Sequence, residues 1–338
     1  MGSFTFKKWN TILGWFVFSI ALVTYWSTVE PTASFWDAGE YITTASNLEV
    51  GHPPGAPLYQ LMGAFFSIFA MEATNIALTI NLMSVFASAF TILFMFWSVT
   101  ILLSNLVKKN DTFTKNNQIA ILGSAVVASL TFAFTDSFWY SAVEAEVYAM
   151  AAFIMSVLFY AGLRWEGEMF TPRGDKWVVL IAFVIGLSFG VHFMGLLTIP
   201  AIGFLYFFKN YNKITVKNFL IANVVTVAIL LFIFKLLLPM TLRFFSAAEI
   251  FFVNQINMPF NSGTIIAGLL FLAVFYFGLR YTRSKSFVKL NTLLLCVLFI
   301  FIGFSSWLML PIRANAGTVI NENNPNNARE LLAYYNRE

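Results

Sequence analysis

The chain has 338 residues, of which 59% are hydrophobic and 11% are charged, and its formal net charge is +4 at pH 7. Together with a mean hydropathy of +0.76, this composition excludes a soluble globular domain. It predicts an integral membrane protein, because several apolar runs reach the roughly 20 residues that cross a bilayer. The basic balance does not indicate a nucleic-acid partner, since Lys and Arg lie in short loops between apolar runs. The single cysteine excludes an intrachain disulfide.

The apolar runs predict an all-α polytopic membrane protein, a bundle of about nine transmembrane helices. The first run follows Lys7 and Lys8 and is too long for a cleaved signal peptide, so we interpret it as a retained signal anchor. Residues 57–71 are apolar but short, and we expect an interfacial helix there. We expect two short spans that meet near Gly190 rather than one long helix. The predicted spans are 11–28, 76–105, 118–135, 143–163, 177–190, 191–208, 218–238, 263–281 and 290–310.

The distribution of charge places the N-terminus inside. In that orientation 15 of the 20 basic residues lie on the inner side and 12 of the 16 acidic residues lie outside. We expect a membrane domain over 1–310 with a large first outer loop at 29–75, and a polar outer tail over 311–338 that begins a further C-terminal region. The inner basic residues are Lys7, Lys8, Lys108, Lys109, Lys115, Arg164, Arg173, Lys176, Lys209, Lys213, Lys217, Arg280, Arg283, Lys285 and Lys289.

The first outer loop contains the densest group of unusual polar residues. Asp37 and Glu40 are three apart, so a helix places them on one face, where two carboxylates can raise each other's pKa and supply a general base. They could equally bind a divalent cation through oxygen ligands, or be solvated acids at a helix N-terminus. His52 precedes a rigid Pro-Pro-Gly turn, which either aims its ring at a substrate or leaves it in water.

Other outer loops contribute further candidates. Glu144 and Glu146 point in different directions on a helix, so only one faces a shared cavity, and we favour Glu146. His192 lies at the outer turn near Gly190, where it either contacts a substrate or packs as a hydrogen-bonded residue. Arg313 follows the last span and is a natural bidentate partner for a phosphate, although an arginine there can also anchor to lipid headgroups.

Two outer segments complete the candidate set. Arg243 belongs to one of them, the long loop 239–262, and Asn324 belongs to the run Asn-Glu-Asn-Asn-Pro that follows the last span. The chain has no P-loop, no Gly-x-Ser-x-Gly, no His-Glu-x-x-His and no Cys/His metal pattern. These absences argue against nucleotide hydrolysis and zinc proteolysis.

Several motifs resemble one family of membrane proteins. They are Trp-Asp-Ala-Gly-Glu-Tyr, Gly-His-Pro-Pro-Gly-Ala-Pro-Leu-Tyr, Ala-Glu-Val-Tyr at 145–148, Pro-Phe-Asn-Ser-Gly at 259–263 and Asn-Glu-Asn-Asn-Pro at 321–325. The order of features resembles the GT-C membrane glycosyltransferases. The motifs more closely resemble a family long known only as a domain of unknown function, abundant in Bacteroidetes. That family includes an animal protein O-mannosyltransferase of the endoplasmic reticulum, and its members are usually much longer than this chain.

The resemblance implies a GT-C-like fold and an inverting sugar transfer at the outer membrane face. The donor would be a polyprenyl-phosphate carrying mannose or a similar hexose, and the acceptor a Ser or Thr hydroxyl of a protein, or a glycan. Asp37 would be the general base and Glu40 would orient it or the acceptor, while Arg313, helped by Arg243 or His192, would hold the donor phosphate. The expected location is a bacterial inner membrane with the active face toward the periplasm. Metal dependence stays open.

Two other classes of function remain as alternatives. A secondary transporter would carry acids or broken helices at mid-membrane and usually internal repeats. The chain shows no repeat, and most of its acids lie at loop ends. A non-catalytic scaffold that docks partners on its outer loops would not explain the rigid motif of the first loop.

Overall fold

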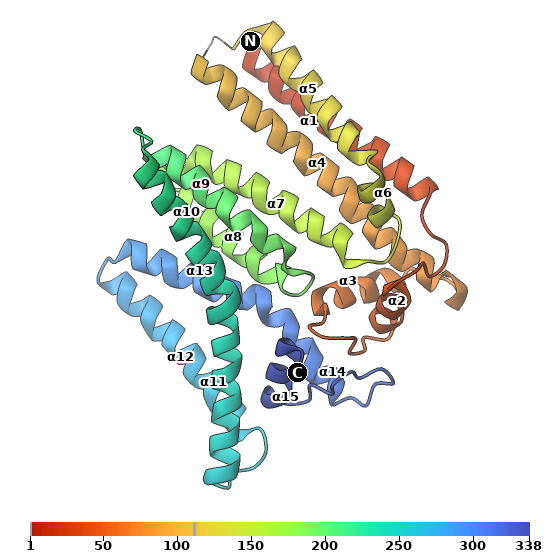
Figure 1. Cartoon of the computed structure of the whole chain (residues 1–338), viewed down its shortest axis with the longest axis vertical. Helices are drawn as coiled ribbons and strands as arrows, with labels where there is room; N and C mark the ends of the chain where they lie inside the picture. The colour runs from red at the N-terminus through yellow and green to blue at the C-terminus, as the bar shows by residue number, and fades with distance from the viewer. Residues whose placement is uncertain (1, 111–112) are drawn as a thin grey trace.

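The structure is a computed structural model that describes residues 2–110 and 113–338. Over these ranges the chain is all-helical and contains no β-sheet, and its extended backbone pairs only in an isolated bridge between Val50 and Asn321. The predicted all-α fold is confirmed. Figure 1 shows an array of long helices with several short helices gathered at one end. Lys108, Lys109 and Asp111 of the predicted inner loop lie outside the part of the chain whose side chains are described.

Long apolar helices form the N-terminal half, and α4 is at its centre because it packs against α1, α5 and α7. Small residues at the contact of α1, α4 and α5 let these helices approach closely. Ala21, Ala89 and Ala125 are all buried there. The helices are α1 (Gly2–Ser27), α4 (Ile76–Asn110), α5 (Lys115–Ala133), α6 (Asp136–Ala142) and α7 (Val147–Glu168).

The second half continues with a helical hairpin and three further long segments. Helix α8 packs against both α7 and α13, and α11 packs against α12 and the C-terminal α15. The elements are α8 (Gly174–Ser188), η2 (Phe193–Leu197), α9 (Thr198–Asn210), α10 (Val216–Leu231), η3 (Phe232–Leu237), α11 (Leu238–Ile250), η4 (Phe251–Gln255), α12 (Ser262–Ser284) and α13 (Val288–Phe304).

Eight helices of the described residues are long and apolar enough to cross a membrane, where the sequence predicted about nine spans. The difference is α8, which has 15 residues and therefore a length of about 22 Å, less than the roughly 30 Å of a hydrocarbon core. Both α8 and α9 are separate helices, as expected, and they turn at residues 189–192. The α8 helix packs against α7 and α13. These longer helices cover the part of the hydrocarbon core that α8 is too short to cross.

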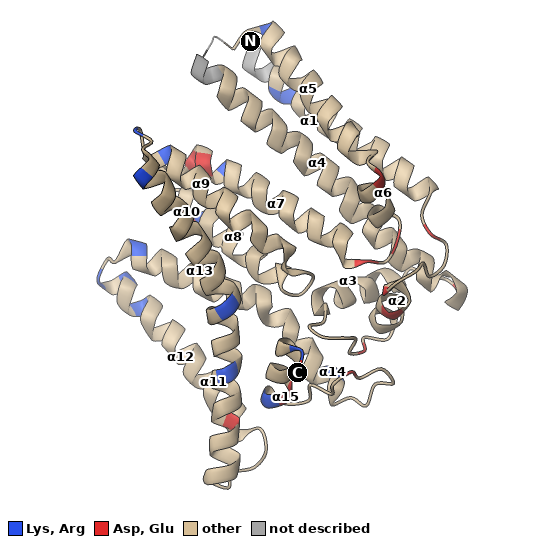
Figure 2. Ribbon diagram, in the orientation of Figure 1, with Lys and Arg blue, Asp and Glu red and all other residues tan. Residues whose placement is uncertain are grey.

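The two ends of the bundle carry different charges. Glu166 at the end of α7 pairs with Lys209 at the end of α9 through a 2.6 Å contact, and it also accepts a hydrogen bond from Asn105 of α4. Loops predicted to lie inside therefore meet at one end. Figure 2 shows that most Lys and Arg lie at this end, and that acidic residues gather around α2 and the connection from α6 to α7.

Short helices cover the opposite end, which the charge distribution predicts to lie outside. The segment predicted as an interfacial helix is α3, whose 11 residues are too few to cross a bilayer. The carbonyl of Gly190 accepts hydrogen bonds from Leu58 and Tyr59, which fixes the start of α3 against the turn between α8 and α9. The short elements are α2 (Ala38–Ser46), α3 (Pro57–Ser67), η1 (Ala73–Asn75), η5 (Ser305–Leu308), α14 (Met309–Ala314) and α15 (Ala328–Asn336).

The C-terminal tail packs onto the first outer loop. Val50 and Asn321 form the isolated bridge, with Val50 N donating to Ile320 O and Glu322 N donating to Val50 O. The hydroxyl of Tyr334 on α15 donates to the carbonyl of Gly51, and its side chain is fully buried. Residues 311–338 are thus continuous with the outer cap of the membrane domain.

Candidate active site at the outer end

Asp37 stands at the N-cap of α2 with its side chain exposed. Its carboxylate makes no hydrogen bond or ion pair with any described residue, while its carbonyl accepts from the amide of Tyr41. The preceding Trp36 has a positive φ of 61°, which turns the chain sharply into the helix.

Glu40 and His52 form a hydrogen-bonded pair within the first loop. The Nδ1 atom of His52 lies 3.0 Å from both carboxylate oxygens of Glu40, and the His52 amide donates to Oε1 at 2.7 Å. Gly51 makes this possible, because a Cβ at that position would lie 2.6 Å from Glu40 Oε1. Both predicted residues are therefore near α2, but Glu40 is engaged by His52 instead of being free to act on a substrate.

Glu146 joins the same group from another part of the chain. It is the N-cap of α7 and only 7% exposed, and its carboxylate lies near the backbone of Asp37 and Val147 without making a capping hydrogen bond. Burial raises the pKa of Glu146 to about 7, and repulsion by the carboxylates of Asp37 and Glu144 adds to the shift. The preference for Glu146 over Glu144 fits this contact with Asp37, although burial also raises the pKa of Glu144.

Two tyrosines that sequence reasoning did not single out form the centre of the group. The Tyr41 ring lies 5.9 Å from the His52 ring and 5.2 Å from the Tyr59 ring. Burial raises the pKa of Tyr41, and the negative charges of Glu146, Asp37 and Glu40 raise it further. The signal was present, since Tyr41 ends the Trp-Asp-Ala-Gly-Glu-Tyr motif, but a tyrosine beside a membrane is most simply interpreted as an interfacial anchor.

His192 borders the group from the turn between α8 and η2. Its Nδ1 accepts a hydrogen bond from the amide of Met194 at 3.2 Å, and its ring lies 5.6 Å from that of Tyr148. Burial lowers the pKa of His192, and the positive charge of Arg337 lowers it further. A neutral imidazole with Nδ1 as acceptor carries its proton on Nε2, which remains available as a donor.

Arg313 contacts the opposite end of α2 from Asp37. Its Nε donates to the carbonyl of Leu48 and its Nη2 to that of Asn47, at 3.1 Å for the latter. These carbonyls belong to the C-terminal end of α2, where a cation is favourable. The structure thus brings Arg313 to the first loop, as a group that holds the loop's backbone.

The remaining predicted residues lie apart from this carboxylate group. Arg243 is exposed on α11, a helix whose main contacts are with α12 and α15. Asn324 has a positive φ of 42°, and its Oδ1 accepts from Asn321 within the turn. Glu249 instead stabilises the start of α12, where it accepts hydrogen bonds from Asn261 N and Thr264 N.

The divalent cation left open by the sequence finds no ligand set here. Within residues 2–110 and 113–338, no three His, Cys, Asp or Glu side chains are placed to hold a metal ion. Of the first-loop acids, Glu40 is already occupied by His52.

An apolar cavity of about 810 Å³ reaches toward the site between α4, α7 and α9. Phe159 and Leu102 line it on the inner side, and Tyr148 lines it at the outer end. Since Tyr148 also contacts His192 and lies within electrostatic range of Tyr41, the outer end of the cavity borders the carboxylate group.

Comparison with known proteins identifies the family. The model of the "Protein O-mannosyl-transferase TMEM260 N-terminal domain" matches residues 37–215, just over half of the chain. The chain belongs to this family. The matched segment begins at Asp37 and includes Glu40, His52, Glu146 and His192, whereas Arg243, Arg313 and Asn324 lie beyond it.

Two curated relatives agree with this assignment. The chain is 23% identical over 210 residues to "Protein O-mannosyl-transferase tmem260" of Dictyostelium discoideum, covering 59% of this chain and 24% of the relative. It is 26% identical over 172 residues to "Protein O-mannosyl-transferase TMEM260" of Mus musculus, covering 51% and 22%. The chain thus spans about a quarter of the length of these relatives. No solved structure matches it.

Proposed function

We propose that this chain carries the catalytic membrane domain of an O-mannosyltransferase. In this proposal it moves mannose from a polyprenyl-phosphate carrier to a Ser or Thr hydroxyl at the outer face of a bacterial inner membrane. The supporting observation is that Asp37, Glu40, His52, Glu146 and His192 gather at one end of the bundle, within the segment that the family model matches. A GT-C-like arrangement is part of the proposal, in which the first outer loop presents the base.

Asp37 is the carboxylate in this group that is free to accept a proton. Glu40 is paired with His52, and Glu146 is buried, whereas the Asp37 side chain is exposed and unengaged. Asp37 would take the proton of the acceptor hydroxyl as its oxygen attacks the anomeric carbon. The bond from that carbon to the phosphate oxygen breaks, and its electron pair leaves with the polyprenyl phosphate. A single displacement inverts the anomeric centre.

The other residues of the group would position this base. The buried Glu146 carboxylate lies near the backbone of Asp37, and the pair of Glu40 with His52 closes the loop that follows α2. Arg313 would act on the same loop from its other end, through the carbonyls of Asn47 and Leu48, rather than on the donor phosphate. A misplaced catalytic group can lose most of its effect, so these contacts matter to the rate.

The donor would lie in the apolar cavity with its phosphate at the outer end. An isoprenoid chain suits the lining between Phe159 and Leu102, and the phosphate would reach Tyr148 and the Nε2 proton of His192. Arg337 lies close enough to affect the charge of His192 and would add a cation at this end. Hydrogen bonds and positive charge there would stabilise the leaving phosphate.

The proposal is tested by following radiolabelled mannose from a polyprenyl-phosphate donor. Membranes that contain the chain should label a Ser/Thr-containing acceptor peptide above the level of membranes without it, and the label should be released by alkali. A peptide with Ala in place of each Ser and Thr is the control. Equal labelling of the two peptides would reject a hydroxyl acceptor, and label that moves from the donor into a second lipid, separated from the donor by chromatography, would favour a glycolipid acceptor.

A further inference from the structure

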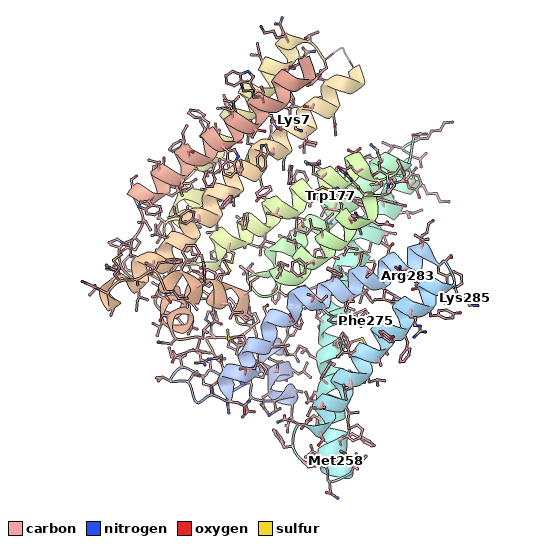
Figure 3. All side chains as sticks on the ribbon, turned by 180° about the vertical axis from the view of Figure 1, so that it is seen from behind. Lys7, Trp177, Met258, Phe275, Arg283 and Lys285 are labelled. Atoms are coloured by element: carbon pink, nitrogen blue, oxygen red, sulfur yellow. The ribbon has the colours of Figure 1, made fainter. Side chains whose placement is uncertain are left out.

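A second cavity lies at the inner end of the bundle, far from the carboxylate group. It has a volume of about 600 Å³ and is formed where α8 begins, α12 ends and α13 starts. Figure 3 shows Arg283 and Lys285 at the end of α12, on the same end of the bundle as Lys7. Met258, which precedes α12, lies at the opposite end of that helix. The distribution of basic residues places this end on the cytoplasmic side of the membrane.

The rim of the inner cavity carries unpaired positive charge. Lys176 and Arg283 both line it, and neither takes part in any ion pair of the described residues. By contrast, Arg164 and Lys209 at the same end of the bundle are paired with acids. Asp175 also lines the rim, so the two cations and one acid leave a local charge of +1.

The inner cavity runs along α13, past the polar side chains of Asn291 and Thr292, to an apolar end at Leu295 and Phe299. From Val288 at the rim to Phe299 is 11 residues of helix, which corresponds to a depth of about 16 Å. This matches half of the roughly 30 Å hydrocarbon core, the thickness of one leaflet. Asn291 fixes the wall, because its amide donates to Leu279 O and Thr282 Oγ1 of α12.

We propose that the inner cavity binds one anionic phospholipid of the cytoplasmic leaflet. Lys176 and Arg283 hold its phosphodiester, and an acyl chain lies along Leu295 and Phe299. A ligand with one negative charge and an apolar tail matches the rim charge, the depth and the position of the site. A soluble phosphate compound would leave the apolar length unfilled. Basic pockets between transmembrane helices on this side are suited to anionic headgroups. The inference does not depend on the proposed transferase activity.

Lipid retention measured by native mass spectrometry tests this site. The full chain is purified in detergent with equal amounts of phosphatidylglycerol, phosphatidylethanolamine and phosphatidylcholine. We expect the wild type to retain one phosphatidylglycerol selectively. Arg283→Gln and Lys176→Gln should each reduce that retention about five-fold, as expected for one basic residue near the membrane surface. Leu295→Trp should reduce it without a change of charge, because the indole fills the apolar length.

Lys217→Gln is the matched control, since Lys217 is an exposed basic residue in the first turn of α10 outside the cavity. It should keep retention within two-fold of the wild type. Each variant's thermal midpoint in phosphatidylcholine alone shows whether it is folded. Equal retention of the three lipids would overturn the proposal. An equal loss of phosphatidylglycerol retention in Lys217→Gln and Arg283→Gln would also overturn it, because the retention would then depend on overall surface charge and not on the inner cavity.

Discussion

Replacing Glu146 with Gln should change how stability depends on pH. In the folded protein the pKa of Glu146 is about 7, against 4.5 for an unperturbed carboxyl group, because burial and the neighbouring carboxylates disfavour its charged form. The unfolded chain therefore releases this proton at lower pH than the folded chain does. The contribution of Glu146 to stability is therefore fully present below pH 4.5, and this contribution is lost as the pH rises from 4.5 to about 7.

The size of this effect follows from the difference between the two pKa values. Between about 7 and 4.5 the carboxyl costs the folded state up to about 3 kcal/mol. For a chain of 338 residues, this corresponds to a shift of about 4 °C in the thermal midpoint. Gln keeps the size and shape of the Glu146 side chain but cannot ionise. The variant should therefore match the wild type near pH 4.5 and exceed it by up to this amount above pH 7.

The measurement is thermal unfolding in detergent, followed by tryptophan fluorescence at fixed scan rate from pH 4.5 to 8. Glu322→Gln is the control, because Glu322 is exposed and carries no burial cost. Its curve should run parallel to that of the wild type. If the curves of Glu146→Gln and the wild type were also parallel, Glu146 would be ionised throughout, and the argument from burial would fail.

Two further predictions concern the first loop and its contacts, and each has a matched control elsewhere in the chain. Arg313→Lys should lower the free energy of unfolding by about 1–3 kcal/mol, since lysine has one nitrogen in place of the two guanidinium nitrogens, Nε and Nη2, that donate to Leu48 O and Asn47 O. Arg243→Lys, at an exposed position, should change it by less than about 0.5 kcal/mol by the same denaturation assay, and equal effects would contradict the role of Arg313. Gly55→Ala should destabilise by more than about 1 kcal/mol, because Gly55 has φ of +74° and a Cβ there would lie 2.7 Å from the Tyr334 hydroxyl. Gly123→Ala should be neutral or stabilising in the same assay, since its Cβ meets nothing within 4 Å in helix α5.

The sequence was sufficient to predict the all-α architecture, the separate short helices around Gly190, and the short apolar segment that became α3. Each of these depends on the length of an apolar run and on where charges interrupt it. The count of spans was less well determined, because α8 has the hydropathy of a span without the length. Its packing between α7 and α13, which no local pattern reports, makes a 15-residue helix sufficient.

The sequence predicted which residues belong to the candidate site better than it predicted what each of them does. Asp37, Glu40, His52, Glu146 and His192 share the outer end because the charge distribution fixes which loops lie there. The partnership of Glu40 with His52 and the contact of Arg313 with the carbonyls of α2 depend on pairs separated by 12 and about 265 residues. Such pairs leave no signature in one sequence. Tyr41 was missed for a related reason, since its central place depends on elements that converge from three segments.

The central claim is that Asp37 is the general base of a mannosyl transfer. The most direct test compares the rates of Asp37→Asn and Asp136→Asn in membranes supplied with radiolabelled polyprenyl-phosphate mannose. Asp136 is a matched control, because it is an exposed acid in the first turn of α6 at the same end of the bundle. We expect Asp37→Asn to lose at least about 100-fold in rate, the usual contribution of a general base. Asp136→Asn should stay within two-fold of the wild type. A transfer rate for Asp37→Asn equal to that of Asp136→Asn would contradict the account.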